Sequence, residues 1–175
     1  MGLLNTSEPE ESAIQYDNRS FKSTIFLGPG AAITHELRIE PTVIRARHSL
    51  SGPFQCQLGY ELTAQQARAM ATYLKNATHI LSSDCQDSNS NPFRDYPLGT
   101  VQATTIDGPI KNIIALDLPN DRVLLYHDTF GQFQPTPNHS LAIADARDLA
   151  SLFDRAADVF ESDKEPFIEL AETDE

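Results

Sequence analysis

The sequence predicts an α+β fold made of two tandem repeats, each an antiparallel β-meander followed by one helix. Two observations predict it. The chain matches itself at an offset of 79 residues, with nine identities in a window of 34 positions, and each copy alternates polar and apolar residues before an amphipathic stretch. The matched segments are HSLSGPFQ at 48–55 and HDTFGQFQ at 127–134. We expect the two copies to be related by a pseudo-twofold axis.

The first repeat is expected to start with a strand at 20–27 and to continue with a hairpin. Residues 33–39 and 44–48 alternate apolar with polar side chains, which is typical of strands with one buried face. A turn at Glu40-Pro41 pairs Ile39 with Thr42 and places Glu36 opposite Arg45.

A third alternating run and a helix complete this repeat. The run has its apolar positions at Phe54, Cys56, Leu58, Tyr60 and Leu62, and Thr63 follows it as a helix N-cap. The buried stripe expected for the helix consists of Ala67, Met70, Ala71, Leu74 and Ala77.

The second repeat is expected to reproduce this order. Residues 98–106 form a strand, and 110–118 and 121–130 form a hairpin that turns at Pro119-Asn120 and pairs Asp117 with Arg122. Asp145 or Ser140 is the expected helix cap. The buried stripe of the second helix is Leu149, Phe153, Ala156, Ala157 and Phe160.

The distribution of charge divides the chain. The formal charge is −12, of which residues 1–17 carry −4 and residues 158–175 carry −7, so the remainder is nearly neutral. We therefore expect an acidic N-terminal segment at 1–17, a first repeat at 18–97 that ends in a polar linker loop at 82–97, a second repeat at 98–160 and an acidic tail at 161–175.

Several functional classes are disfavoured. The acidic balance argues against a nucleic-acid partner, and the longest apolar runs are far shorter than the roughly 20 residues of a membrane span. Two cysteines do not form a disulfide scaffold, which favours a reducing, cytoplasmic location. No cofactor is predicted, and a homo-oligomer is compatible with the sequence.

His48 and His127 are the candidate catalytic residues, because they occupy equivalent positions on equivalent strands. His127-Asp128-Thr129 resembles the His-x-Thr/Ser motif of two-histidine phosphoesterases. The resemblance implies that the two imidazoles exchange protons with the reacting oxygens and that the Thr129 hydroxyl holds the phosphate. His48-Ser49-Leu50 departs from the motif, since leucine stands where the hydroxyl is required.

A metal site is a second chemical alternative. His35 shares a strand face with His48, and Glu61, His79 or His139 could approach the pair. The sequence contains no His-x-His pair and no other close His/Cys spacing, so metal ligands are not predicted from spacing.

The scarcity of catalytic groups favours a non-enzymatic module that binds another protein, as an inhibitor or regulator. The candidate contact residues are Phe93, Arg94 and Tyr96 in the linker loop and Phe167 and Ile168 in the acidic tail. The alternative is a small phosphoesterase or metal-dependent enzyme centred on His48 and His127.

Overall fold

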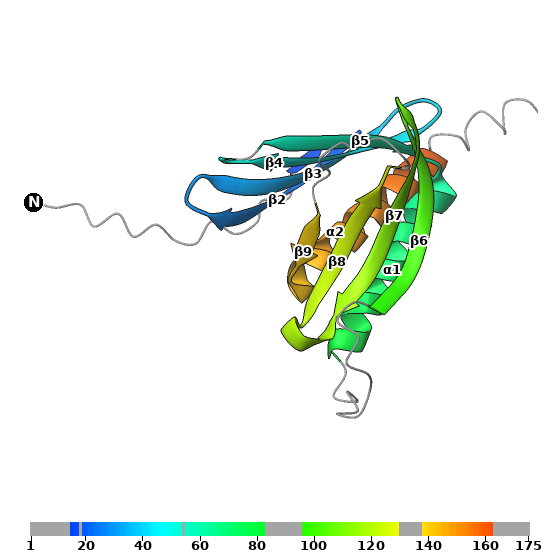
Figure 1. Ribbon diagram of the computed structural model, residues 1–175. Helices are drawn as coiled ribbons and strands as arrows, with labels where there is room; N and C mark the ends of the chain where they lie inside the picture. The colour runs from blue at the N-terminus through cyan, green and yellow to red at the C-terminus, as the bar shows by residue number, and fades with distance from the viewer. Residues whose placement is uncertain (1–14, 18, 54, 83–95, 130–137, 163–175) are drawn as a thin grey trace, which may run out of the picture.

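The computed structural model describes residues 15–17, 19–53, 55–82, 96–129 and 138–162. Within these ranges, nine strands, one 3-10 turn and two helices follow one another (Figure 1). Their bounds are β1 Gln15–Asp17, β2 Ser20–Gly28, β3 Ala31–Ile39, β4 Ile44–Ser51, β5 Cys56–Leu62, α1 Ala64–Ser82, β6 Tyr96–Thr105, β7 Gly108–Asp117, η1 Leu118–Asn120, β8 Arg122–Asp128, β9 His139–Leu141 and α2 Ile143–Ser162.

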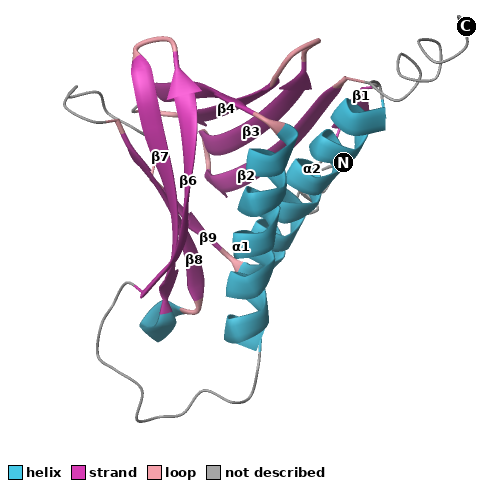
Figure 2. Cartoon of the chain, turned by 90° about the vertical axis from the view of Figure 1, so that its right-hand side faces the viewer, coloured by secondary structure: helices cyan, strands magenta, loops and turns pink. Residues whose placement is uncertain are grey.

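The strands form one antiparallel sheet in which spatial order equals chain order, β1 to β9. The sheet is nearly divided at its middle, because β5 and β6 share only the pair Glu61↔Thr104. We call β1–β5 the first half-sheet and β6–β9 the second half-sheet. Figure 2 shows the two half-sheets inclined to each other, with both helices on the same side of them. The predicted α+β class is confirmed.

The core fills the space between the half-sheets and the helices. Among the strands, α1 contacts mainly β6 and β7, whereas α2 contacts mainly β2 and β3, so α1 packs onto the second half-sheet and α2 onto the first. The expected helical stripes are buried in full, from Ala67 to Ala77 in α1 and from Leu149 to Phe160 in α2. Because the apolar face of each helix is buried, packing of these faces stabilises the helices more than intrinsic helix propensity does.

The start of α1 agrees with the sequence prediction. The Thr63 hydroxyl accepts a hydrogen bond from the Gln66 backbone N–H at 3.1 Å, and the Gln66 side-chain oxygen accepts one from the Thr63 N–H at 2.8 Å. This reciprocal pair is a capping box, which satisfies two backbone donors at the helix end.

The cap predicted for α2 is wrong. The helix begins at Ile143, the Ala146 N–H donates to the Ala142 carbonyl at 2.9 Å, and Ala142 therefore stands at the N-cap. Ser140 lies in β9, where its hydroxyl accepts a hydrogen bond from Arg122 at 3.1 Å. Because β9 stays paired through Leu141, Ala142 alone separates strand from helix, and alanine has no side-chain acceptor with which to cap the helix.

The register of the first hairpin also differs from expectation. Ile39 pairs with Ile44, and the Glu40 N–H donates to the Val43 carbonyl at 3.0 Å, so the tip of the turn is Pro41-Thr42. Proline favours the first central position of a β-turn, which Pro41 occupies in the observed turn. In the expected turn, Pro41 would have occupied the second central position. The second hairpin has the expected register, with Asp117 opposite Arg122.

The two helices lie side by side and antiparallel (Figure 2). Arg68 near the start of α1 donates to Glu161 near the end of α2 at 2.6 Å, and Lys75 at the middle of α1 pairs with Asp154. Arg147 near the start of α2 donates to the Ser82 hydroxyl at the end of α1 at 2.9 Å. These exposed contacts set the alignment of the helices more than they add stability.

The segments expected at the termini are only partly covered. Most of the linker loop, the acidic tail from residue 163 and residues 1–14 lie outside the described residues.

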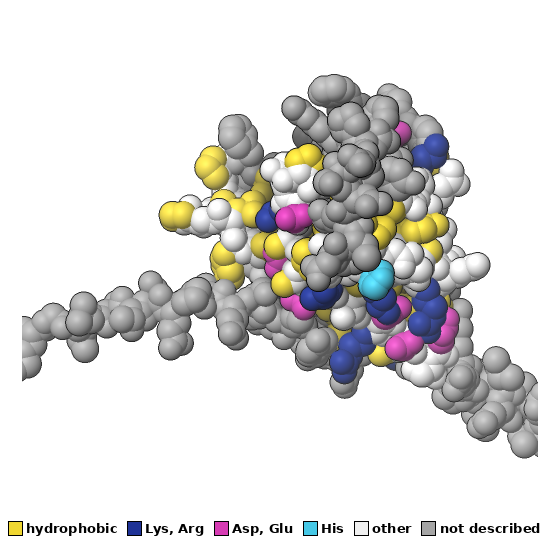
Figure 3. Space-filling view, turned by 90° about the horizontal axis from the view of Figure 1, so that it is seen from below, with side chains coloured by type: hydrophobic (Ala, Val, Ile, Leu, Met, Phe, Trp, Pro, Cys, Tyr) yellow, Lys and Arg dark blue, Asp and Glu magenta, His cyan; other side chains and the backbone are white. Residues whose placement is uncertain are grey.

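Neither helix has the length and apolar content to cross a membrane. On the face shown in Figure 3, basic and acidic side chains lie next to one another.

We expect Gly99→Ala to destabilise the fold, because a Cβ at this position in β6 would overlap the Tyr73 ring of α1. Overpacking of this kind costs about 1–3 kcal/mol of unfolding free energy, measurable by urea denaturation. The matched control is Gly59→Ala, where the nearest atom to the new Cβ is the Ala46 carbonyl oxygen at 3.7 Å. Equal stability losses in the two variants would contradict the close approach of Tyr73.

Candidate functional site

Four histidines lie buried where the two half-sheets approach each other. We call His35, His48, His127 and His139 the histidine cluster. They come from β3, β4, β8 and β9, and their exposed fractions are 0%, 0%, 7% and 1%. The fifth histidine, His79, is exposed on α1.

The strand pattern places these rings inside. His35 stands two residues from Leu37, and His48 stands two residues from Ala46, and both neighbours are fully buried. Since side chains on a strand alternate between the faces, the histidines share the apolar face of the first half-sheet. His35 and His48 are also direct partners in the β3–β4 register.

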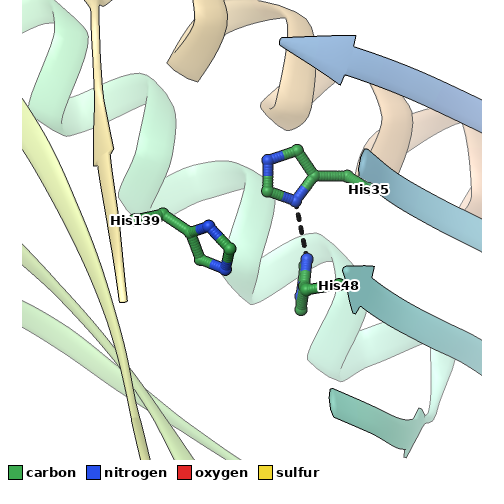
Figure 4. Close-up of side chains that lie close together, drawn as sticks. All are labelled: His35, His48 and His139. Atoms are coloured by element: carbon green, nitrogen blue, oxygen red, sulfur yellow. Dashed lines mark hydrogen bonds between the residues drawn. The ribbon is translucent and has the colours of Figure 1, made fainter. Parts of the chain in front are cut away.

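Three of the rings have the arrangement of a metal-binding group (Figure 4). His35, His48 and His139 each offer a ring nitrogen, and the three nitrogens lie within 4.8 Å of one another. The Nδ1 atoms of His35 and His48 are 2.6 Å apart. A contact this short requires one lone pair and one proton, or a shared cation, between the two nitrogens.

Tyr60 on β5 contacts the second ring nitrogen of His48. Its hydroxyl lies 2.6 Å from His48 Nε2, and the residue is 1% exposed. Both nitrogens of His48 are therefore engaged, Nδ1 with His35 and Nε2 with Tyr60. This pair fixes the plane of the His48 ring.

In the second half-sheet, Asn112 on β7 contacts His127. His127 Nδ1 lies 2.7 Å from the Asn112 Oδ1, and the two residues are partners in the β7–β8 register. A carbonyl oxygen only accepts, so His127 carries its proton on Nδ1 and its ring lone pair on Nε2.

The four rings pack as one body. The ring centroids of His48 and His127 are 5.1 Å apart in a stacked arrangement, and His139 lies 4.9 Å from His35, 5.2 Å from His48 and 5.5 Å from His127. Each half-sheet thus presents two imidazoles to the other.

Burial governs the protonation of the cluster. Desolvation lowers the pKa of His127 to about 3 and that of His139 to about 4, and it holds the pKa of His35 and His48 well below their usual value. Neighbouring imidazoles lower the pKa of His35, His48 and His127 further, because two cations would repel. All four rings are therefore neutral at pH 7, with lone pairs available.

Some polar atoms in the cluster lack a hydrogen-bond partner among the described residues. They are His35 Nε2, Asn112 Nδ2 and both ring nitrogens of His139. A buried polar atom left without a partner costs roughly 1–3 kcal/mol. The imidazole nitrogens among these atoms, which are buried and belong to neutral rings, fit a cation ligand set better than a hydrogen-bond network.

The two histidines selected from sequence, His48 and His127, do lie together. Their rings face other side chains of the core, however, and Thr129 follows β8 as a half-buried residue. A phosphate would have to displace that core to touch both imidazoles. The phosphoesterase interpretation stays a prediction.

The other candidates separate clearly. Of the residues named for a metal, His35 and His139 join His48, whereas Glu61 pairs with Arg45 at 3.0 Å and His79 is exposed. Of the residues named for protein binding, Tyr96 begins β6 and its side chain is not described. Phe93, Arg94, Phe167 and Ile168 lie outside the described residues.

Sequence reasoning missed the roles of Tyr60 and Asn112. The strand phase predicts Tyr60 in the core, where it lies, but does not predict the contact of its hydroxyl with His48. Asn112 carried a usable signal, because a polar residue stands between Ile110 and Ile114 in the inward phase of a strand.

Comparisons with protein-family models, curated proteins and solved structures found no match to this chain. The histidine cluster is therefore interpreted from its own geometry.

We expect the metal-free protein to lose stability below pH 6.5. The pKa of an unfolded histidine is about 6.5, and those of folded His127 and His139 lie near 3 and 4, so the unfolded state binds more protons in between. Stability is complete above pH 6.5 and falls with pH towards these lower values, by up to about 1.4 kcal/mol per pH unit for each histidine.

Urea denaturation at pH 7.0, 6.0 and 5.0, with a chelator present, measures this loss. His79→Ala is the control, since removing the exposed histidine should leave the pH slope unchanged. An unfolding free energy that stays constant from pH 7 to pH 5 would disprove the burial of neutral imidazoles.

Proposed function

We propose that this chain is a metal-binding protein that holds a divalent transition-metal ion between its two half-sheets. The ligands are His35, His48 and His139. The observation that carries the proposal is the convergence of three buried imidazoles from β3, β4 and β9, with their ring nitrogens within 4.8 Å of one another. The predicted role in binding another protein stays a prediction, since most of its residues lie outside the described structure.

The ligand type indicates the class of metal. The grouped donors are all imidazoles, which suit zinc, copper and nickel, whereas calcium and magnesium prefer oxygen ligands. At a zinc–nitrogen distance of about 2.0–2.1 Å, two tetrahedral ligand atoms stand about 3.4 Å apart. The His35 and His48 nitrogens, now 2.6 Å apart, would move apart by less than about 1 Å.

Protonation and hydrogen bonding support the same role. A histidine must be neutral to bind a metal, and the low pKa values of the cluster satisfy this condition at pH 7. The Tyr60 hydroxyl can accept a hydrogen bond from His48 Nε2–H, which leaves His48 Nδ1 as the ligand atom. A cation would also provide a partner for His139.

We further infer that the two halves of the chain arose by duplication and that a pseudo-twofold axis passes through the cluster. The helix contacts support this. Arg68 contacts Glu161, and Arg147 contacts Ser82. Arg147 is the equivalent of Arg68 at the offset of 79 residues, and Glu161 is the equivalent of Ser82, so each contact is the counterpart of the other. Lys75 contacts Asp154, its own equivalent at the same offset. Reciprocal contacts of this kind are the mark of a twofold interface.

The sheet supports the same offset. Ala46 pairs with Tyr60, and 79 residues later Leu125 pairs with His139. Helices α1 and α2 begin at Ala64 and Ile143, again 79 residues apart. His48 then corresponds to His127, Tyr60 to His139 and, by strand register, His35 to Asn112.

We expect Zn²⁺ to raise the melting temperature of the wild-type protein. At a free zinc concentration of 100 times Kd, binding adds about 2.7 kcal/mol, which corresponds to roughly 5–10 °C for a chain of this size. His139→Ala should abolish most of this shift, because it removes one ligand, whereas His79→Ala should keep it. Thermal denaturation with zinc, magnesium or a chelator measures the effect.

Isothermal titration of the folded variants provides the affinity directly, with circular dichroism as the check of folding. Wild-type protein that neither binds zinc nor gains stability would refute the metal site. An equal response to magnesium would refute its imidazole character.

The duplication predicts that the site can be rebuilt on the opposite side of the axis. The double variant His35→Asn/His139→Tyr should lose zinc binding. Adding Asn112→His and Tyr60→His should restore it, because these positions are the proposed equivalents. Titration of both variants measures this, and a fourfold variant that folds but does not bind would argue against the equivalence.

A further inference from the structure

We propose that His127 is the fourth ligand of this metal and that Asn112 is its positioning residue, so that the site is closed. The inference rests on the metal-binding role proposed above. A fourth protein ligand distinguishes a structural site from a catalytic one, because structural zinc sites have four protein ligands and catalytic ones keep one position open.

The position of His127 supports a ligand role. Its ring centroid lies 5.1 Å from that of His48 and 5.5 Å from that of His139, compared with 4.9–5.2 Å among the other three rings. The proposed equivalent of His127 at the offset of 79 residues, His48, belongs to the three-histidine group. A site on a pseudo-twofold axis is expected to use both members of this pair.

Asn112 selects the ligand atom of His127. Its Oδ1 accepts the Nδ1 proton at 2.7 Å, so the Nε2 lone pair is the one available to a metal. Tyr60 contacts the other ring nitrogen of His48, Nε2, and so leaves Nδ1 of His48 for the metal. Metal-bound histidines typically donate their second ring N–H to such an outer partner.

Four imidazoles would leave no position for a substrate on a tetrahedral ion. Two of the ligands, His35 and His48, belong to the first half-sheet, and the other two, His127 and His139, belong to the second. The ion would then cross-link the half-sheets, which share one strand pair at β5–β6. Its role would be to hold the fold closed.

Cobalt tests this, because Co²⁺ in four-coordinate tetrahedral sites absorbs visible light much more strongly than in five- or six-coordinate sites. We expect wild-type protein with Co²⁺ to show intense bands that azide does not alter, since no position is open to azide. His127→Ala should weaken these bands, make them sensitive to azide and reduce affinity by more than the roughly 10- to 100-fold loss typical of an outer partner. His79→Ala should match the wild type.

Asn112 is tested by a pair of substitutions. Asn112→Leu removes the acceptor and should lower cobalt affinity by roughly 10- to 100-fold, whereas Asn112→Asp keeps an acceptor oxygen and should retain the wild-type spectrum. A general packing defect would affect the two variants alike, and equal spectra with equal affinities would overturn the positioning role.

The outcomes separate the two proposals. Cobalt bands of the wild type that shift on addition of azide, or a His127→Ala spectrum identical to the wild type, would overturn the closed site while leaving the three-histidine site intact. Absence of any cobalt binding by the wild type would overturn the metal site and this inference with it. The azide experiment uses wild-type protein and does not depend on the folding of a variant.

Discussion

Desolvation of four imidazoles is the constraint around which this molecule is organised. The histidine cluster lies in the core, where His48 contacts His35 and Tyr60 within the first half-sheet and His127 contacts Asn112 within the second. Burial keeps the rings neutral, and neutrality allows rings that would repel as cations to pack at centroid distances near 5 Å. The apolar residues on either side, such as Leu37 and Leu125, exclude the water that would otherwise solvate them.

Local features of the fold were readable from sequence to different degrees. The phase of each strand follows from side-chain alternation and the stripes of both helices from helical periodicity, which together predict that Leu58, Met70 and Phe153 lie in the core, where they are buried. The capping box at Thr63 is encoded within four residues. The hairpin register at Pro41 and the start of α2 were wrong, because each depends on how neighbouring elements compete for one or two residues.

The candidate site was only half predictable, for a different reason. His48 and His127 were found because the self-match aligned them, and His35 because it shares a strand face with His48. The convergence of β9 with β3 is a tertiary contact between residues 104 positions apart, and no spacing in the sequence reports it. Tyr60 and Asn112 each contribute one polar group within an otherwise apolar strand pattern. Their roles become visible only when the positions of His48 and His127 in the fold are known.

The strand order has a consequence for how this protein behaves at high concentration. A nine-stranded antiparallel sheet has two outer edges, and unpaired backbone groups on an edge can recruit the edge of another molecule. Here the outermost described strands are β1 and β9, which have three residues each, while the interior strands have seven to ten. Short outer strands limit the template available for intermolecular strand pairing, so the large sheet is compatible with a chain that resists aggregation.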